Sequence, residues 1–153
     1  MKLRIIRAKD QKERELVREF AVWAGNQLLG PKLNRNCEIT VSFKKFTKVE
    51  GEIYEGLCTV IDDSPNPRRF LIHVEENVSL KRKMGIIAHE LTHAKQYARR
   101  ELTFRKNTDF WNGEEMDPDL EYWLQPWEVE AFGQQTCLYK AFRRRNRKKI
   151  VLK

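Results

Sequence analysis

Cysteine is scarce in this sequence, and its spacing does not favour disulfides or a thiolate metal site. The 153 residues contain three cysteines, Cys37, Cys58 and Cys137, which are far apart and form no Cys-x-x-Cys pair. An odd number without close spacing argues against a disulfide framework and against a thiolate metal cluster. We expect three reduced, mainly structural thiols in a cytoplasmic protein.

Long apolar runs are also missing. The first residues, Met1 to Arg7, alternate charged and apolar side chains, which is not the pattern of a signal peptide or a membrane anchor. Hydrophobic residues still make up 41% of the chain, enough for one globular core at this length. The sequence predicts a single domain over residues 1–153 that is soluble and has no membrane partner.

Negative charge is outnumbered, since the formal net charge is +8. Residues 143–153 form a basic C-terminal tail, in which six cations crowd into positions 143–149: Arg143, Arg144, Arg145, Arg147, Lys148 and Lys149. Two interpretations stay open for this tail. It could make a weak contact with nucleic acid or an acidic partner, or it could be a solvated helix end. Nothing in it is typical of base recognition.

Only three histidines are present, yet two stand four residues apart in His89-Glu90-Leu91-Thr92-His93. Positions i and i+4 share one face of a helix, so two neutral imidazoles there can bind one zinc ion. Glu90 lies about 100° further round the helix. Its carboxylate can reach a water on the metal rather than the metal itself. The motif indicates a zinc hydrolase.

Apolar spacing predicts three helices and three strands, and therefore an α+β fold. The helices run from a cap at Asp10 to Gly30-Pro31, from a cap at Ser79 to about Arg100, and from Pro126 to Phe142. The strands are 37–46, 54–61 and 70–74, with turns at Gly51 and at 62–67, and their close connections favour an antiparallel meander. Residues 101–125 have no sustained period and are expected to form a long loop.

The middle helix is predicted to have two different faces. Met84, Ile87, Leu91, Ala94 and Ala98 fall in one apolar stripe, and the two histidines fall opposite that stripe. We therefore expect one face to pack on a core and the other to turn the imidazoles toward a cleft.

The third zinc ligand has several candidates, because a catalytic zinc usually has three protein ligands and no histidine follows His93. These candidates are His73, an acidic residue of the 101–125 loop, Glu128 and Glu130. Helical angles place Glu128 on the apolar face of its helix and Glu130 on the other face. A buried carboxylate needs a counter-charge, which zinc would supply, so Glu128 is favoured. A carboxylate in the first turn also suits the helix dipole. His73 alternates out of the apolar face of its strand and is expected at the surface or in a cleft.

The sequence AHELTHAKQY at residues 88–97, followed by YWLQPWEVEAFG at residues 122–133, resembles the gluzincin metallopeptidases. In those enzymes two histidines and a glutamate from a later Glu-x-x-Ala hold zinc. The same stretches resemble small, largely uncharacterised zinc metallopeptidases encoded mainly by bacteriophages, which are close in plan to the compact minigluzincins, and the resemblance covers roughly residues 37–142. SprT-like proteases share the first motif but use a downstream third histidine, which this chain lacks.

The resemblance implies a zincin-like domain in which a short sheet covers the active-site helix and a glutamate helix lies behind it. The strand Phe70–Val74 would be the edge on which an extended peptide pairs. Zn²⁺ would be held by His89, His93 and Glu128, and the substrate would be a peptide or protein.

The expected activity is hydrolysis of peptide bonds by a metal-activated water, with Glu90 as general base. Tyr122 is a candidate second donor to the oxyanion, and aromatic packing beside Trp123 and Trp127 is the alternative role for it. Two other functions stay open. One is a nucleic-acid- or partner-binding module with structural or vestigial zinc, and the other is a zinc amidase acting on a non-protein amide.

Overall fold

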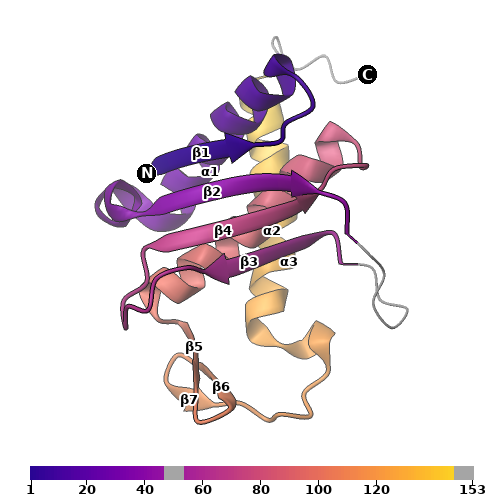
Figure 1. The fold of residues 1–153 in the computed structure, drawn as a ribbon. Helices are drawn as coiled ribbons and strands as arrows, with labels where there is room; N and C mark the ends of the chain where they lie inside the picture. The colour runs from indigo at the N-terminus through magenta and orange to yellow at the C-terminus, as the bar shows by residue number, and fades with distance from the viewer. Residues whose placement is uncertain (47–53, 147–153) are drawn as a thin grey trace.

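A computed structural model describes residues 1–46 and 54–146 (Figure 1). The turn predicted at Gly51 and positions 147–153 of the basic tail lie outside these residues. Along the chain the elements are β1 (Lys2–Ile6), α1 (Gln11–Asn36), β2 (Glu38–Lys44), β3 (Gly56–Val60), β4 (Arg69–Glu75), α2 (Leu80–Arg99), β5 (Leu102–Arg105), β6 (Thr108–Trp111), β7 (Glu114–Glu115), the 3-10 turn η1 (Tyr122–Leu124) and α3 (Pro126–Arg145). The α+β class is confirmed.

The main sheet has four strands in the order β1-β2-β4-β3. Strands β1 and β2 are parallel, β2 and β4 are parallel, and only β3 runs antiparallel to its neighbour β4. The predicted three-stranded antiparallel meander is therefore wrong in its pairing. Strand β2 pairs with β4 and not with β3, and Ile39 lies opposite Phe70. The predicted edge strand, Phe70–Val74, is internal, and the two edges are β1 and β3.

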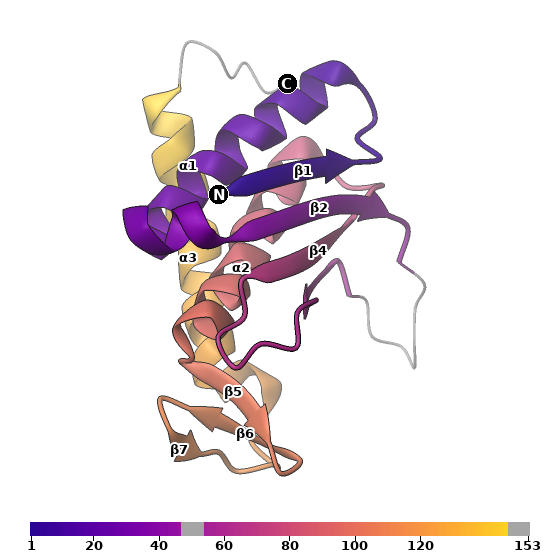
Figure 2. The ribbon, with the colours of Figure 1, turned by 60° about the vertical axis from the view of Figure 1, so that its left-hand side comes forward.

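The three helices lie on one side of this sheet (Figures 1 and 2). Helix α2 packs against α1, α3 and strands β3 and β4, so it is the central helix of the domain. Its predicted stripe, including Met84, Ile87 and Leu91, is buried together with Phe20 of α1 and Ile72 of β4. The face of α2 that carries the histidines is turned toward α3 and β3.

Helix α1 begins as predicted and ends later than predicted. The Asp10 side chain accepts a hydrogen bond from the backbone N–H of Glu13 at 2.8 Å. At Gly30 the backbone turns to φ 72° and ψ 167°, which glycine adopts at little cost, and the helix resumes to Asn36 after this kink. Pro31 opens the resumed segment, where its missing N–H leaves no bond unmade.

Residues 101–125 are more regular than the predicted loop. Strands β5, β6 and β7 form a small antiparallel sheet, separate from the main sheet and joined by tight turns (Figure 1). Both Lys106 and Asn107 have positive φ, as do Asn112 and Gly113, which is the backbone of type I′ hairpin turns. Within the described residues, no helix is long and apolar enough to cross a membrane.

Candidate metal centre

Two neighbouring helices bring the three predicted ligands together. His89 and His93 stand one turn apart on α2, and Glu128 lies in the first turn of α3, which Pro126 opens at its first position as predicted. The Nε2 atoms of the histidines are 3.1 Å apart. Glu128 Oε2 is 3.2 Å from His89 Nε2, and Glu128 Oε1 is 3.3 Å from His93 Nε2. The two nitrogens and the carboxylate, which offers a different oxygen to each nitrogen, thus form a compact triangle of donor groups.

This triangle fits a zinc ion. Zinc bonds of 2.0–2.1 Å in tetrahedral geometry put ligand atoms about 3.3 Å apart, close to the three separations in this cluster. The side chains are only 9%, 12% and 9% exposed for His89, His93 and Glu128. Burial opposes ionisation of Glu128, but hydrogen bonds from both histidines outweigh it and lower its pKa to about 2. Two imidazoles and a carboxylate are a donor set that zinc prefers.

His93 is oriented by a hydrogen-bond chain. Its Nδ1 lies 2.8 Å from Gln96 Oε1. The Gln96 amide nitrogen donates to the Trp127 carbonyl and to Glu130 Oε2, both at 2.9 Å, which fixes the oxygen of that amide toward His93. Nδ1 of His93 therefore carries a proton and donates it to Gln96, and Nε2 is the nitrogen that would bind a metal.

His89 is held by packing instead. Its ring meets Phe132 edge-on with centroids 4.6 Å apart and His93 edge-on at 4.8 Å. Its buried Nδ1 makes no hydrogen bond within residues 1–46 and 54–146. Phe132 thus orients the His89 ring by packing, whereas Gln96 orients His93 by a hydrogen bond.

Glu90 lies beside the ligands but outside the triangle, against the edge strand β3. A Cβ atom added at Gly56 would overlap Glu90 Oε1 and would lie 2.6 Å from Ile86 Cγ2. Only glycine lets the β3 backbone come this close, and the backbone N–H of Cys58 donates to the Glu90 carboxylate. Burial raises the pKa of Glu90, against the attraction of His93 and His89 and the Cys58 hydrogen bond.

Tyr122, from the 3-10 turn before α3, reaches the ligand group. Its hydroxyl donates to Glu128 Oε2 at 2.7 Å. Its ring also meets Trp123 edge-on at 5.3 Å and lies 6.4 Å from Phe132. Burial, followed by the Glu128 hydrogen bond, raises the pKa of Tyr122, so the phenol keeps its proton and remains a donor.

The other candidate ligands lie elsewhere. Glu130 accepts hydrogen bonds from Lys95 at 2.6 Å and from Gln96 at 2.9 Å, which places it behind the site. His73 stands in β4 opposite Ser42 and Leu57 and is not part of the group. The group that could hold a metal in the described part of the chain is His89, His93 and Glu128.

A cleft of about 540 Å³ opens onto this group. One wall is the end of β3 with Gly56, and another is aromatic, with Tyr122, Trp123 and Phe132. His89 and Glu90 face it from α2. The sequence analysis did not identify Gly56, Gln96 or Phe132. Gln96 could have been found, because it stands three residues after His93 and so shares its helix face.

Comparisons of the whole chain with family models, with curated proteins and with solved structures give no match.

Proposed function

We propose that this chain is a metal-dependent hydrolase whose ion, zinc, is held by His89, His93 and Glu128. The observation that carries the proposal is the buried group of two imidazoles and one carboxylate, whose nearest donor atoms are 3.1–3.3 Å apart, with a further carboxylate, Glu90, beside it at the floor of a cleft. Three such groups without a cation are costly to bury, and a divalent ion offsets that cost.

Within that class, the particular enzyme that we propose is a peptidase of the gluzincin type. An exposed sheet edge beside the base favours a peptide, because an extended chain can add to the edge by backbone hydrogen bonds. Strand β3 is such an edge, and its Leu57 side chain is 48% exposed. A peptide paired there would pass Gly56 with an amide facing Glu90.

When bound, zinc would supply a Lewis acid and would lower the pKa of its water to roughly 7. Glu90 takes the proton of the attacking water on a carboxylate oxygen and gives it to the leaving amine nitrogen. Its raised pKa suits both steps, because a group titrating nearer neutrality both accepts and releases a proton readily. The net change adds OH to the carbonyl carbon and H to nitrogen as the C–N bond breaks.

We propose that Tyr122 positions Glu128, and its role as an oxyanion donor stays a prediction. Tyr122→Phe separates the two roles because the ring packing is kept. Loss of a bond that orients a ligand should weaken zinc binding about 10–100-fold. An oxyanion donor would instead lower kcat about 10²–10³-fold and leave zinc affinity unchanged.

Metal content tests the ligand assignment. Purified wild-type protein should hold one zinc and Glu128→Ala should lose it. Glu130→Ala removes a partner of Lys95 and of Gln96 but should keep zinc, because the Trp127 carbonyl still holds the Gln96 amide. Loss of zinc only in the Glu130 variant would refute the proposed ligand set.

Turnover tests the activity. Wild-type protein, offered casein, a peptide library and peptidoglycan fragments, should cut peptides. Glu90→Gln should keep zinc and lose cleavage. Cleavage confined to peptidoglycan fragments would favour the amidase, and an unimpaired Glu90→Gln variant would exclude Glu90 as the base.

A further inference from the structure

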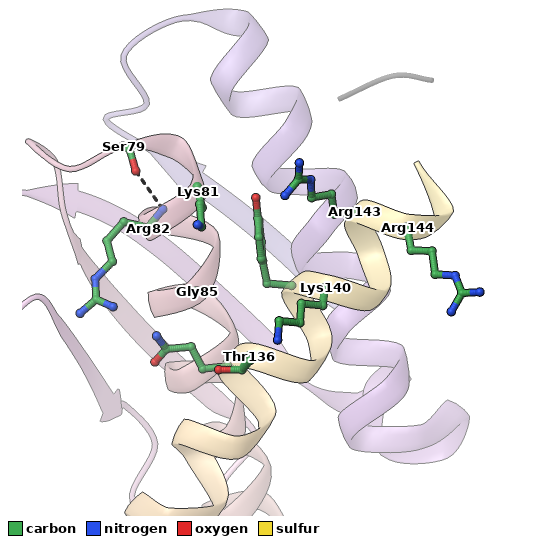
Figure 3. A pocket seen from close by; sticks show the side chains of 10 residues that line it. Ser79, Lys81, Arg82, Gly85, Thr136, Lys140, Arg143 and Arg144 are labelled. Carbon is green, nitrogen blue, oxygen red and sulfur yellow. Dashed lines mark hydrogen bonds between the residues drawn. The ribbon is translucent and has the colours of Figure 1, made fainter. Parts of the chain in front are cut away.

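A second, larger cavity of about 990 Å³ lies between the start of α2 and the C-terminal half of α3 (Figure 3). Its lining is strongly basic. Two cations come from α2 and three from α3, and no carboxylate lines it: Lys81, Arg82, Lys140, Arg143 and Arg144. In Figure 3, Lys81, Lys140 and Arg143 lie around the space between the two helices, while Arg144 points away from α2. We call this cavity the basic pocket.

Most of this charge has no counter-charge. Arg82 Nε donates to Glu55 at 2.6 Å. The other four cations make no ion pair within residues 1–46 and 54–146, and all four are exposed. Like charges so grouped repel one another, and an anion in the pocket would relieve that repulsion.

The basic pocket is continuous with the metal cleft. Arg82 and Gln135 line both. They mark the junction, with Arg82 on α2 and Gln135 facing Gly85 across the helix contact. A chain lying in the cleft beside Glu90 that continued past Gln135 would enter the basic pocket.

We propose that the basic pocket binds an acidic segment of the polypeptide substrate, on one side of the bond to be cut. This inference rests on the proposed peptidase function. It identifies the substrate class as peptides that combine a region fitting the aromatic-walled cleft with a nearby run of Asp or Glu. Extended residues advance about 3.4 Å each, so a few residues bridge the two cavities.

A peptide suits this path better than a nucleic acid does. Glu55 stands at the junction, where it holds Arg82. A nucleic-acid strand carries a phosphate at every nucleotide and would bring one against Glu55. A peptide can place a neutral residue there and its carboxylates further on, beside Lys140 and Arg143.

Binding of labelled peptides tests the proposal. Each probe has an apolar centre and four glutamates or four glutamines at one end, and both chain directions are made. Fluorescence anisotropy is measured on zinc-loaded Glu90→Gln protein, so that no probe is cut. In one chain direction, the glutamate probe should bind at least about tenfold tighter than its glutamine counterpart, which is the effect of about 1.4 kcal/mol.

A charge-matched pair of variants locates the effect. Lys140→Glu should abolish the preference for glutamate. Lys32→Glu makes the same charge change on α1 and should retain the preference. Lys32 is exposed and follows Leu28 and Leu29, whose carbonyls accept from Arg99 at the far end of α2. Equal binding of the two probes, or equal loss in both variants, would overturn the proposal.

Two further measurements separate the remaining alternatives. An oligonucleotide that binds through Lys140 more tightly than the glutamate probe does would assign the pocket to nucleic acid and overturn the proposal. Cleavage of both probes by wild-type protein is followed separately. If neither probe is cut, but the glutamate probe still binds more tightly and Lys140→Glu abolishes that preference, the peptidase function fails and acidic-peptide binding stands.

Discussion

Gly56→Ala should separate catalysis from metal binding. The added Cβ would overlap Glu90 Oε1 and would lie 2.6 Å from Ile86 Cγ2. An ordinary contact between carbon atoms is about 3.5–4.0 Å, so strand β3, the Glu90 carboxylate or both must move by roughly 1 Å. Ile86 is buried and β-branched, which leaves the carboxylate as the easier group to displace. The three atoms nearest to the new methyl group belong to Glu90 and Ile86, and not to a proposed zinc ligand.

The expected loss of activity is large and the loss of stability modest. A displacement of about 1 Å in a reacting group can cost 10²-fold in rate, so kcat/KM should fall about 10–100-fold. Overpacking costs typically 1–3 kcal/mol, and a few degrees of Tm would report it at this chain length. Zinc content should stay at the wild-type value.

Gly133→Ala is the matched control. Gly133 lies in α3, and a Cβ there would meet nothing within 4 Å. This variant should keep full activity and gain roughly 0.5–1 kcal/mol, because alanine favours a helix over glycine. Rates on the peptides that wild-type protein cuts, zinc content and Tm are compared for the three proteins. A Gly56→Ala enzyme as active as wild type would refute the claim that the approach of β3 positions Glu90 for catalysis.

Three other variants test the network around the site and the core. Gln96→Leu removes the partner of His93 Nδ1 and should weaken zinc binding about 10–100-fold in competition with a chelator, and unchanged affinity would contradict the orienting role. In the wild-type protein, buried Glu13 accepts a hydrogen bond from Lys83 at 2.6 Å. Lys83→Met leaves this carboxylate without its counter-charge, so the free energy of unfolding in urea should fall by about 3–5 kcal/mol. Adding Glu13→Leu should restore most of that loss. Burial, with nearby cations, lowers the pKa of His73 from 6.5. As the pH falls, the unfolded chain therefore takes up a proton at this residue before the folded chain does, and stability falls below about pH 6.5. His73→Gln should flatten that fall by at most about 1.4 kcal/mol per pH unit, and identical slopes would show that His73 carries none of it.

The sequence predicts that His89, His93 and Glu128 meet, because each step of that prediction depends on one helix at a time. The spacing of His89 and His93 fixes their common face, and the apolar neighbours of Glu128 fix its inward face. The structure bears out both placements, including the choice of Glu128 over Glu130 as the neighbour of the histidines.

Strand pairing is not predictable in the same way. Alternation in residues 38–44 shows that a strand exists and which face is buried, but the partner depends on how the connections run. Strand β1 was not predicted as a strand, although Lys2–Ile6 alternates, and it pairs with β2 in parallel. With β1 and β4 on its two sides, β2 has no free edge for β3.

One local signal in residues 101–125 was available. Asn112-Gly113 is typical of a two-residue hairpin turn, and it connects β6 to β7. The other turn uses Lys106 and Asn107, and lysine is not a residue that indicates positive φ. Strands of four, four and two residues are too short for alternation to be distinguished from a loop.

The corrected topology changes the chemistry that can be argued, as well as the fold. Had β4 been the edge, a paired peptide would lie on a strand that contributes no group to Glu90. With β3 at the edge, the base contacts Gly56 and accepts from the Cys58 N–H, which belongs to the outer side of the strand, the side to which a substrate would add. Any shift of β3 that follows peptide pairing would therefore move the surroundings of Glu90 directly. This coupling needs a glycine at position 56, because a side chain there would hold the strand away from the carboxylate.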